Sequence, residues 1–308
     1  MRVSPALWAA LVGVVGLTGC DIEDFAGARY NQDFHYSYPL QSGGRLSIET
    51  FNGSIDLAGW DQSTVDISGT KYGPSPEAAS ALHIEVTNTP DSVYIKVVRP
   101  AEFRGNRGAR FTVRMPRKAI VDRITTSNGT IQVMDAVGPA HLRTSNGRVR
   151  VGGFDGSLDV HTSNGSIELT DVTGEVVART SNSGINVFHL RGPLEAGTSN
   201  GSINAELAAG SSGPVRLDTS NSGVDLTLPG NFPSGVRVGT SNGHITVHSS
   251  GPVNAQVTAR TNNSTVTSDF EMRVQGELTR NHMDGTIGNG GPLWDLTTSN
   301  SPIRLLRM

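Results

Sequence analysis

The residues best placed to interact along this chain are asparagines in a repeated phrase, of which TSNGSIEL at residues 162–169 is one copy. A side-chain amide carries both a donor and an acceptor, so asparagines stacked above one another form a hydrogen-bonded ladder. We predict a structural ladder rather than a row of ligand-binding amides, because the flanking residues keep the alternation of buried strands. Its predicted members are Asn128, Asn146, Asn164, Asn182, Asn200, Asn221, Asn242, Asn263 and Asn300.

A column of variable residues after each asparagine is one place to look for catalysis. An enzyme acting on polysaccharides needs carboxylates gathered on one outer face, often with Ca²⁺ and a basic residue. The column contains Asp56, Gln132, Arg150, Glu168, Asn186, Asn204, Asp225, Thr246 and Thr267. Its carboxylates do not fall on neighbouring repeats, although Arg150 and Glu168 are expected to pair. The sequence therefore assigns no catalytic residues.

A second column, just before the repeated threonine, is more basic. It contains Arg143, His161, Arg179, Gly197, Asp218, Gly239 and Arg260. Its stretch from 143 to 179 suits an anionic glycan or a phospholipid headgroup, but we favour a solvated face. The eight histidines, at positions 35, 83, 141, 161, 189, 244, 248 and 282, share no column and lack metal-ligand spacing such as HExxH. We expect no metal and no cofactor.

The N-terminus has the features of a lipoprotein signal peptide. The apolar run at residues 6–17 follows Arg2 and is 12 residues long, shorter than the roughly 20 that span a bilayer. It ends in LTGC, which resembles the lipobox of bacterial lipoproteins and makes Cys20, the only cysteine, the lipidated residue. We expect a signal peptide at 1–19 and lipidated Cys20 (for example by palmitate) with a tether at 20–44. An ordinary signal peptide is the alternative.

The spacing of the asparagines predicts the architecture that would position them. The step is 18 residues from Asn128 to Asn200 and 21 from there to residue 284, where Asp284 is taken as a variant of the asparagine. Apolar residues alternate on both sides of each asparagine, as in strands with one buried face. Such units bury that face only by stacking. We predict an all-β fold, a single-stranded right-handed parallel β-helix or β-solenoid with about 11 coils of 18–21 residues. Glycine after the asparagine is expected to supply a positive φ.

Residues 45–308 are expected to form this solenoid domain, with an irregular antiparallel insertion or cap at 58–122. Segments 63–73, 82–88, 92–98 and 109–116 alternate as strands, residues 74–81 suit one short helix, and Pro90 and Asp91 suit a hairpin turn. A cap would cover the open strand edges at the end of a stack.

Several of these segments carry a family resemblance. GWDQSTVDISGTKYG at 59–73, FTVRMP at 111–116 and the TSNGSIEL-type units resemble the DUF4097 family of adhesin-like β-solenoid domains, over most of residues 45–308. The resemblance implies an envelope-associated β-helical domain, linked in some members with envelope-stress sensing. It brings no known catalytic residues.

These observations predict a class of function. A net charge of −3 offers no basic field for nucleic acid. We expect a non-catalytic adhesin-like or scaffolding lipoprotein, attached to a membrane through the lipid on Cys20. It would face the periplasm or the cell surface and have an envelope protein or glycan as partner. The alternatives are a polysaccharide-active β-helix lyase or hydrolase, and a self-assembling envelope rod.

Overall fold

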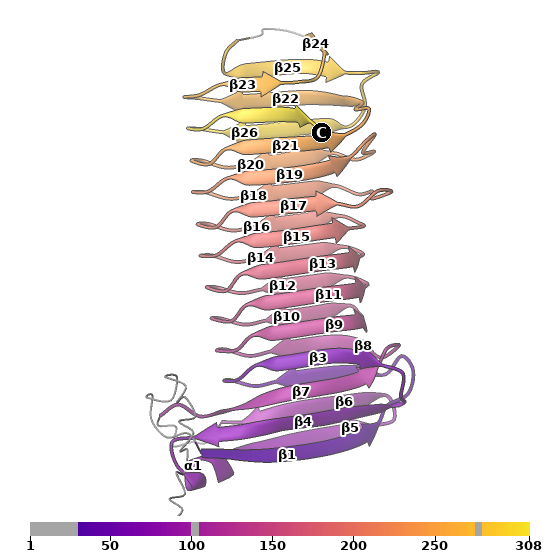
Figure 1. Cartoon of the computed structure of the whole chain (residues 1–308), viewed down its shortest axis with the longest axis vertical. Coiled ribbons are helices and arrows are strands. Elements are labelled where there is room, and N and C mark those ends of the chain that lie inside the picture. The colour runs from indigo at the N-terminus through magenta and orange to yellow at the C-terminus, as the bar shows by residue number, and fades with distance from the viewer. Residues whose placement is uncertain (1–29, 100–104, 275–278) are drawn as a thin grey trace, which may run out of the picture.

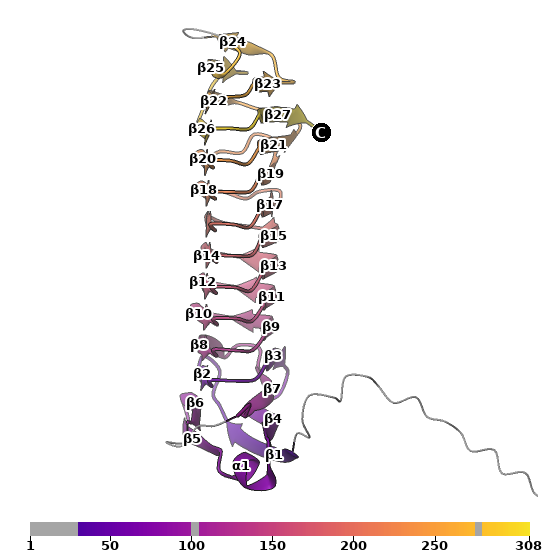
Figure 2. The ribbon, with the colours of Figure 1, turned by 90° about the vertical axis from the view of Figure 1, so that its left-hand side faces the viewer.

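The chain winds into a tall stack of two-stranded rungs in the computed structural model, which describes residues 30–99, 105–274 and 279–308 (Figure 1). Strands that precede an asparagine corner pair into one sheet, here called the upstream sheet. Strands that follow a corner form the downstream sheet, and the two sheets face each other across the core (Figure 2). The predicted all-β, mostly parallel solenoid is confirmed.

The strands follow one another along the stack, from the N-terminal end to the C-terminal end. The upstream sheet contains β5 (His83–Thr89), β6 (Ser92–Val98), β2 (Arg45–Glu49), β8 (Ile120–Thr125), β10 (Ala140–Arg143), β12 (Leu158–His161), β14 (Val176–Arg179), β16 (Leu194–Gly197), β18 (Val215–Asp218), β20 (Val236–Gly239), β26 (Leu293–Thr298), β22 (Ala255–Thr261), β25 (His282–Ile287) and β24 (Met272–Val274). The downstream sheet contains β1 (Tyr30–Pro39), β4 (Thr64–Gly73), β7 (Gly108–Pro116), β3 (Ile55–Trp60), β9 (Ile131–Val137), β11 (Val149–Asp155), β13 (Ile167–Thr173), β15 (Ile185–Leu190), β17 (Ile203–Leu207), β19 (Val224–Pro229), β21 (Ile245–Ser250), β27 (Ile303–Arg307) and β23 (Val266–Ser268). The short helix α1 (Pro76–Ser80) lies beside β1 and β4.

Each regular rung buries alternate side chains from both sheets. In the rung of β10 and β11, Leu142, Val149 and Val151 are almost completely buried. Parallel in-register pairing places Leu142 between Ile124 and Val160 of the adjacent rungs. The core is therefore a continuous column of aliphatic side chains, each contributing about 1.5–3 kcal/mol by leaving water.

At both ends, the spatial order of the rungs departs from the order of the chain. The rung of β2 and β3 lies between β6–β7 and β8–β9. The rung of β26 and β27, built by the last residues, lies between β20–β21 and β22–β23. Trp294 of β26 is 1% exposed, opposite Val236 on one side and Val257 on the other. Each inserted rung therefore pairs on both sides.

One prediction about the C-terminal coils is wrong. Asp284 is not at a corner, because it lies in β25 and pairs antiparallel with Thr258 of β22. Ten rungs in the described part of the chain carry an asparagine corner, and the rung of β6 and β7 has none. The 21-residue spacing is a coincidence here, because β24 and β25 form an antiparallel pair that closes the end of the stack.

The predicted tether at 20–44 is too long at its C-terminal end. Residues 30–39 form β1, which pairs antiparallel with β4 along its whole length. Phe34, Tyr36 and Tyr38 pack against the core, and Leu40 is buried. These apolar residues bind the segment to the domain. Residues 20–29, the signal peptide and Cys20 lie outside the described residues.

The predicted insertion at 58–122 is antiparallel only in part. Strands β4 and β5 are antiparallel to their neighbours, and the expected turn joins β5 to β6. Helix α1 begins after Ser75, whose side chain accepts a hydrogen bond from the Ala78 amide. Strands β6 and β7, however, pair parallel with β2 and β3 and so form a rung of the stack.

Candidate functional site

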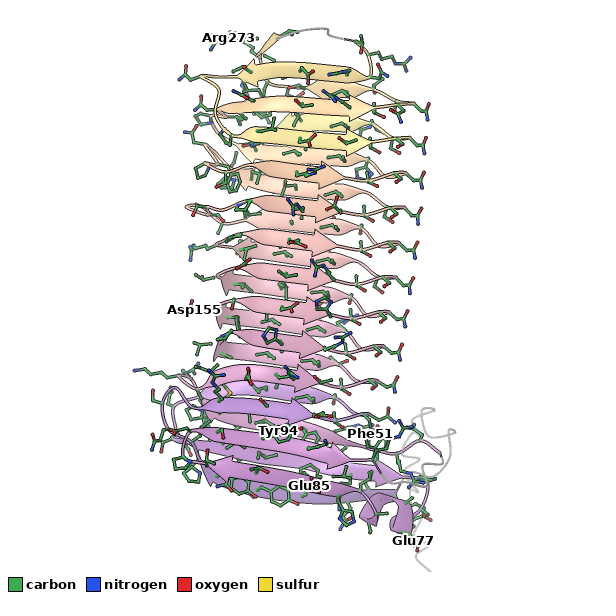
Figure 3. All side chains as sticks on the ribbon, turned by 180° about the vertical axis from the view of Figure 1, so that it is seen from behind. Phe51, Glu77, Glu85, Tyr94, Asp155 and Arg273 are labelled. Carbon is green, nitrogen blue, oxygen red and sulfur yellow. The ribbon has the colours of Figure 1, made fainter. Side chains whose placement is uncertain are left out.

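The structure brings the predicted ladder asparagines into one column, together with Asn52. The order is 52, 128, 146, 164, 182, 200, 221, 242, 300 and 263, and nine amide-to-amide hydrogen bonds of 2.6–2.9 Å join them. Every Nδ2 donates toward the N-terminal end, where Asn52 Nδ2 donates to the Arg107 carbonyl. The predicted members are all exposed. Figure 3 shows side chains projecting at regular intervals along the edge of the stack near Phe51.

The threonine and glycine beside each asparagine close the corner. Thr144 is buried, donates to the Gly129 carbonyl at 3.0 Å and accepts from the Gly147 amide at 3.2 Å. The expected positive φ is wrong at most of these glycines, although Gly53 has one, +120°. Glycine is needed for space, because a Cβ on Gly147 would lie 1.7 Å from the Gly129 oxygen. The ladder is therefore built on close contact between successive backbones.

The stacking of the rungs also brings residues of the two predicted surface columns next to one another. Arg150 and Glu168 form the expected pair, at 2.9 Å between Nη2 and Oε2. In the second column, Arg179 forms an ion pair with Glu195, and His161 Nε2 lies 2.9 Å from Asp159 Oδ1. Exposed pairs of this kind contribute about 0–1 kcal/mol each. The predicted basic stretch at 143–179 is thus partly neutralised by neighbouring carboxylates.

Two kinds of feature are absent from residues 30–99, 105–274 and 279–308. No group of three or more His, Cys, Asp or Glu side chains there is arranged to hold a metal ion. No helix in these ranges is both long enough and apolar enough to span a membrane.

A groove on the outer face of the upstream sheet is lined by apolar, acidic and basic side chains. It crosses the rungs of β14, β16, β18, β20 and β26 and has a volume of about 360 Å³. Pro193, Pro214 and Leu293 supply apolar surface, and Leu293 is 51% exposed. The charged residues that line the groove are Glu175, Glu195, Arg216, Arg237 and Asp295.

Two arginines are placed side by side in this groove. Arg216 of β18 is the direct register partner of Arg237 of β20, and both are exposed. Arg237 Nε lies 4.0 Å from Asp295 Oδ2. Within the part of the chain that the structure describes, the side chain of Arg216 forms no hydrogen bond or ion pair. Like charges placed opposite each other are unfavourable. Carboxylates flank the two arginines in the same row, with Glu195 opposite Arg216 and Asp295 opposite Arg237.

Asp218 adds a carboxylate next to the arginines. It follows Arg216 by two residues on the same face, between Gly197 and Gly239 on the adjacent strands. Burial raises the pKa of Asp218 above its ordinary 3.8, while Arg237 and Arg216 oppose the shift. A Cβ on Gly239 would lie 2.8 Å from Asp218 Oδ1, so glycine leaves room for the carboxylate.

The column of Asp218 was predicted from the sequence, but the column two residues earlier, which contains Glu195, Arg216 and Arg237, was not. One signal was available. The two arginines are 21 residues apart, the spacing of Asn221 and Asn242 in the same rungs.

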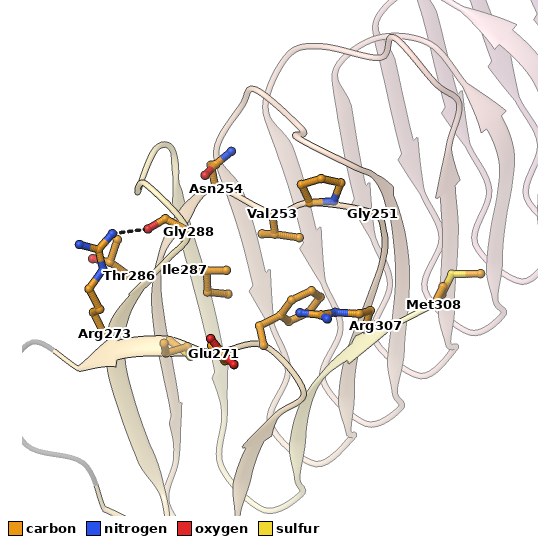
Figure 4. Close-up of a pocket in the computed structure, with 13 residues that line it drawn as sticks. Gly251, Val253, Asn254, Glu271, Arg273, Thr286, Ile287, Gly288, Arg307 and Met308 are labelled. Atoms are coloured by element: carbon orange, nitrogen blue, oxygen red, sulfur yellow. Dashed lines mark hydrogen bonds between the residues drawn. The ribbon is translucent and has the colours of Figure 1, made fainter.

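A larger hollow of about 800 Å³ lies at the C-terminal end, where short β23 leaves its rung incomplete (Figure 4). Its two guanidinium groups already have partners. Arg273 Nη2 donates to the Gly288 carbonyl at 2.5 Å, and the Arg307 guanidinium lies 5.3 Å from the centre of the Phe270 ring. The groove on the upstream sheet is therefore the better candidate for binding.

The fold and the surface columns define a two-sheet parallel β-solenoid that exposes repeating polar surfaces along its sides. A family model, Toastrack DUF4097, matches residues 45–287, and the chain belongs to that family. No curated protein matches the sequence.

Two solved structures are similar to the chain. One is described as a putative cell adhesion protein from Clostridium sporogenes, with 9% identity and a TM-score of 0.26, covering 90% of this chain and 100% of that one. The other is described as a putative adhesin from Bacteroides fragilis, with 13% identity and a TM-score of 0.37, covering 89% of this chain and 97% of that one.

Proposed function

We propose that this chain is a non-catalytic, adhesin-like interaction module of the cell envelope, attached to a membrane through lipid on Cys20 and facing the extracytoplasmic side. The observation that carries the proposal is the long, in-register stack with a groove and polar columns along its sides. Nine ladder steps at about 4.8 Å per rung extend roughly 43 Å. A rod of this kind presents binding surfaces at a distance from its attachment point.

The attachment rests on the sequence before residue 30. The LTGC segment ends an apolar run of signal-peptide length. Each buried CH₂ of an added acyl chain contributes about 0.8 kcal/mol to membrane affinity, and more than one chain is needed for stable attachment. Residues 21–29 then connect the lipid to β1, reaching at most about 30 Å when extended.

The test uses the full chain expressed in a bacterial host. We expect the wild type in the membrane fraction, with a mass increase from lipid, and Cys20→Ala in the soluble extracytoplasmic fraction. Identical fractionation of the two proteins would contradict the attachment. The anchored wild type is then used to pull down components of envelope fractions, with a lipidated unrelated protein as control. Retention of the same components by both proteins would contradict the interaction role.

One observation favours a second candidate function. Glu195, Asp218 and Asp295 share the outer face of the upstream sheet with Arg216 and Arg237. Carboxylates beside arginines suit a polysaccharide lyase or hydrolase. Incubation of the purified protein with acidic polysaccharides, with and without Ca²⁺, separates the two functions. Release of shorter chains would establish the enzyme, and recovery of intact polysaccharide would favour binding alone.

Self-assembly into an envelope rod is the other alternative. The terminal strands of the described chain are β1 and β5 at one end and β23 and β24 at the other. Strands β23 and β24 have three residues each, whereas β1 has ten. Such unequal edges pair poorly. Sedimentation at high protein concentration checks this, and a monomer would exclude the rod.

A further inference from the structure

We propose that the groove on the upstream sheet binds an acidic polysaccharide, with a sugar carboxylate held between Arg216 and Arg237. The proposal deepens the envelope interaction role described above and rests on it. It names the partner as a glycan that carries uronic acid groups.

Two cationic side chains lie next to each other at one position in the groove. Arg216 and Arg237 are direct partners on adjacent strands, and a carboxylate between them removes their repulsion. The planar guanidinium group binds a carboxylate through two parallel hydrogen bonds. Both arginines are exposed, so their guanidinium groups are accessible to a ligand.

The remaining lining suits a sugar rather than a simple anion. Pro193, Pro214 and Leu293 offer apolar surface against which the C–H face of a pyranose ring can pack. Glu175 and Asp295 lie in the same lining and accept hydrogen bonds from hydroxyl groups. Binding sites for small molecules typically combine apolar walls with a few placed polar groups.

The direction of the groove favours a chain rather than a single sugar. The groove crosses five successive rungs of the upstream sheet, from β14 to β26. Rungs repeat at about 4.8 Å, similar to the length of one sugar unit in an extended glycan. A chain lying parallel to the stack would place consecutive sugars over consecutive rungs, so affinity should increase with chain length.

The experiment measures binding of defined oligogalacturonates to the full chain by calorimetry. Arg216→Gln and Arg237→Gln are each expected to weaken binding roughly tenfold, because each loses a charge-assisted contact. Arg304→Gln, an exposed arginine on the downstream sheet, is the matched control and should bind like the wild type. Thermal unfolding of each variant shows that the fold is kept. Equal affinity of all four proteins would overturn the proposal.

Other probes separate the sources of the anion. Neutral oligosaccharides of equal length should bind at least tenfold more weakly, because they lack the carboxylate. Vesicles containing anionic phospholipid and inorganic phosphate are the phosphate probes, and preference for either over oligogalacturonate would overturn the glycan proposal. In the envelope pull-down, partners retained equally by wild type and both groove variants would refute this site while leaving the proposed function standing. If the wild type itself retains no specific partner, both the site and the proposed function are refuted.

Discussion

Between β8 and β21 the rungs stack in the order of the chain, whereas at both ends a rung enters between two others. The local contacts are nevertheless the same in both regions. Asn300, in the inserted rung, makes 2.7 Å hydrogen bonds with Asn242 and Asn263, as Asn164 does with its neighbours in the middle. The repeated phrase therefore makes rungs stackable without specifying their order. Order at the ends depends on the antiparallel strands and connections around them.

The largest effect should come from removing the inserted C-terminal rung. Deleting residues 292–308 exposes the strands on both sides of it and removes Trp294, Leu296, Ile303 and Leu305 from the core. At about 1.5–3 kcal/mol for each buried side chain, we expect the structure from β22 onward to be lost. Limited proteolysis and circular dichroism during heating will show this.

Removal of one middle rung is the matched comparison. Deleting residues 165–182 takes out one 18-residue repeat and joins Asn164 to Ser183, another corner serine. The remaining rungs keep their register, so we expect a cooperative fold with a Tm only a few degrees lower. If this deletion is as damaging as the C-terminal one, the distinction between middle and end is wrong.

A smaller effect should come from filling the space between two middle corners. Gly147→Ala would place a Cβ 1.7 Å from the Gly129 oxygen, and we expect a loss of about 3 kcal/mol or more in the free energy of unfolding. Gly210→Ala is the control, because its φ is +78° but no atom lies within 4 Å. It should cost roughly 1–2 kcal/mol. Urea denaturation measures both, and equal losses would refute close packing as the reason for glycine.

Interior and terminal positions of the ladder can be compared with substitutions that should lower the free energy of unfolding by a smaller amount. Asn164→Ala breaks two hydrogen bonds, with Asn146 and Asn182, whereas Asn263→Ala breaks one, with Asn300. At about 0.5–1.5 kcal/mol per bond, the middle substitution should cost about twice as much. Denaturant titration of the two variants provides the check. A larger loss at Asn263 would show that the terminal amide does more than extend the ladder.

The smallest effects should appear as opposite pH dependences. Burial raises the pKa of Asp284 at the C-terminal end, but hydrogen bonds with His282 and Thr258 outweigh burial and bring the pKa below 3.8. Asp284 therefore contributes stability above pH 3.8, which is lost as the pH falls through its folded pKa. Burial raises the pKa of Asp218, so its ionisation lowers stability above that raised pKa.

Replacing these two carboxylates should change Tm in opposite directions. At pH 7, Asp284→Asn is expected to lower Tm and Asp218→Asn to raise it, and both differences should vanish well below pH 3.8, the ordinary Asp pKa in both cases. Scanning calorimetry across this range measures them. A shift of the same sign in both variants would contradict the two environments described for these carboxylates.

The sequence predicted the regular part of the fold because burial and the corner recur there at fixed spacing. It did not reveal the rung order, since Asn263 and Asn300 fit the same pattern and either could lie beside Asn242. Asp284 fitted the spacing, with Ile287 three residues later, but lacks the preceding Thr-Ser of a corner. Strand β1 was overlooked even though Phe34, Tyr36 and Tyr38 alternate. The groove was missed because its residues converge only when the rungs stack.

The inserted C-terminal rung also affects how the molecule responds to tension. Strand β27 is paired with β21 on one side and β23 on the other. A pull on the last residues must shear both pairings together, instead of unzipping a single edge. At the opposite end, β4 is the only strand of the described residues that pairs with β1, so mechanical unravelling should start from the N-terminal end.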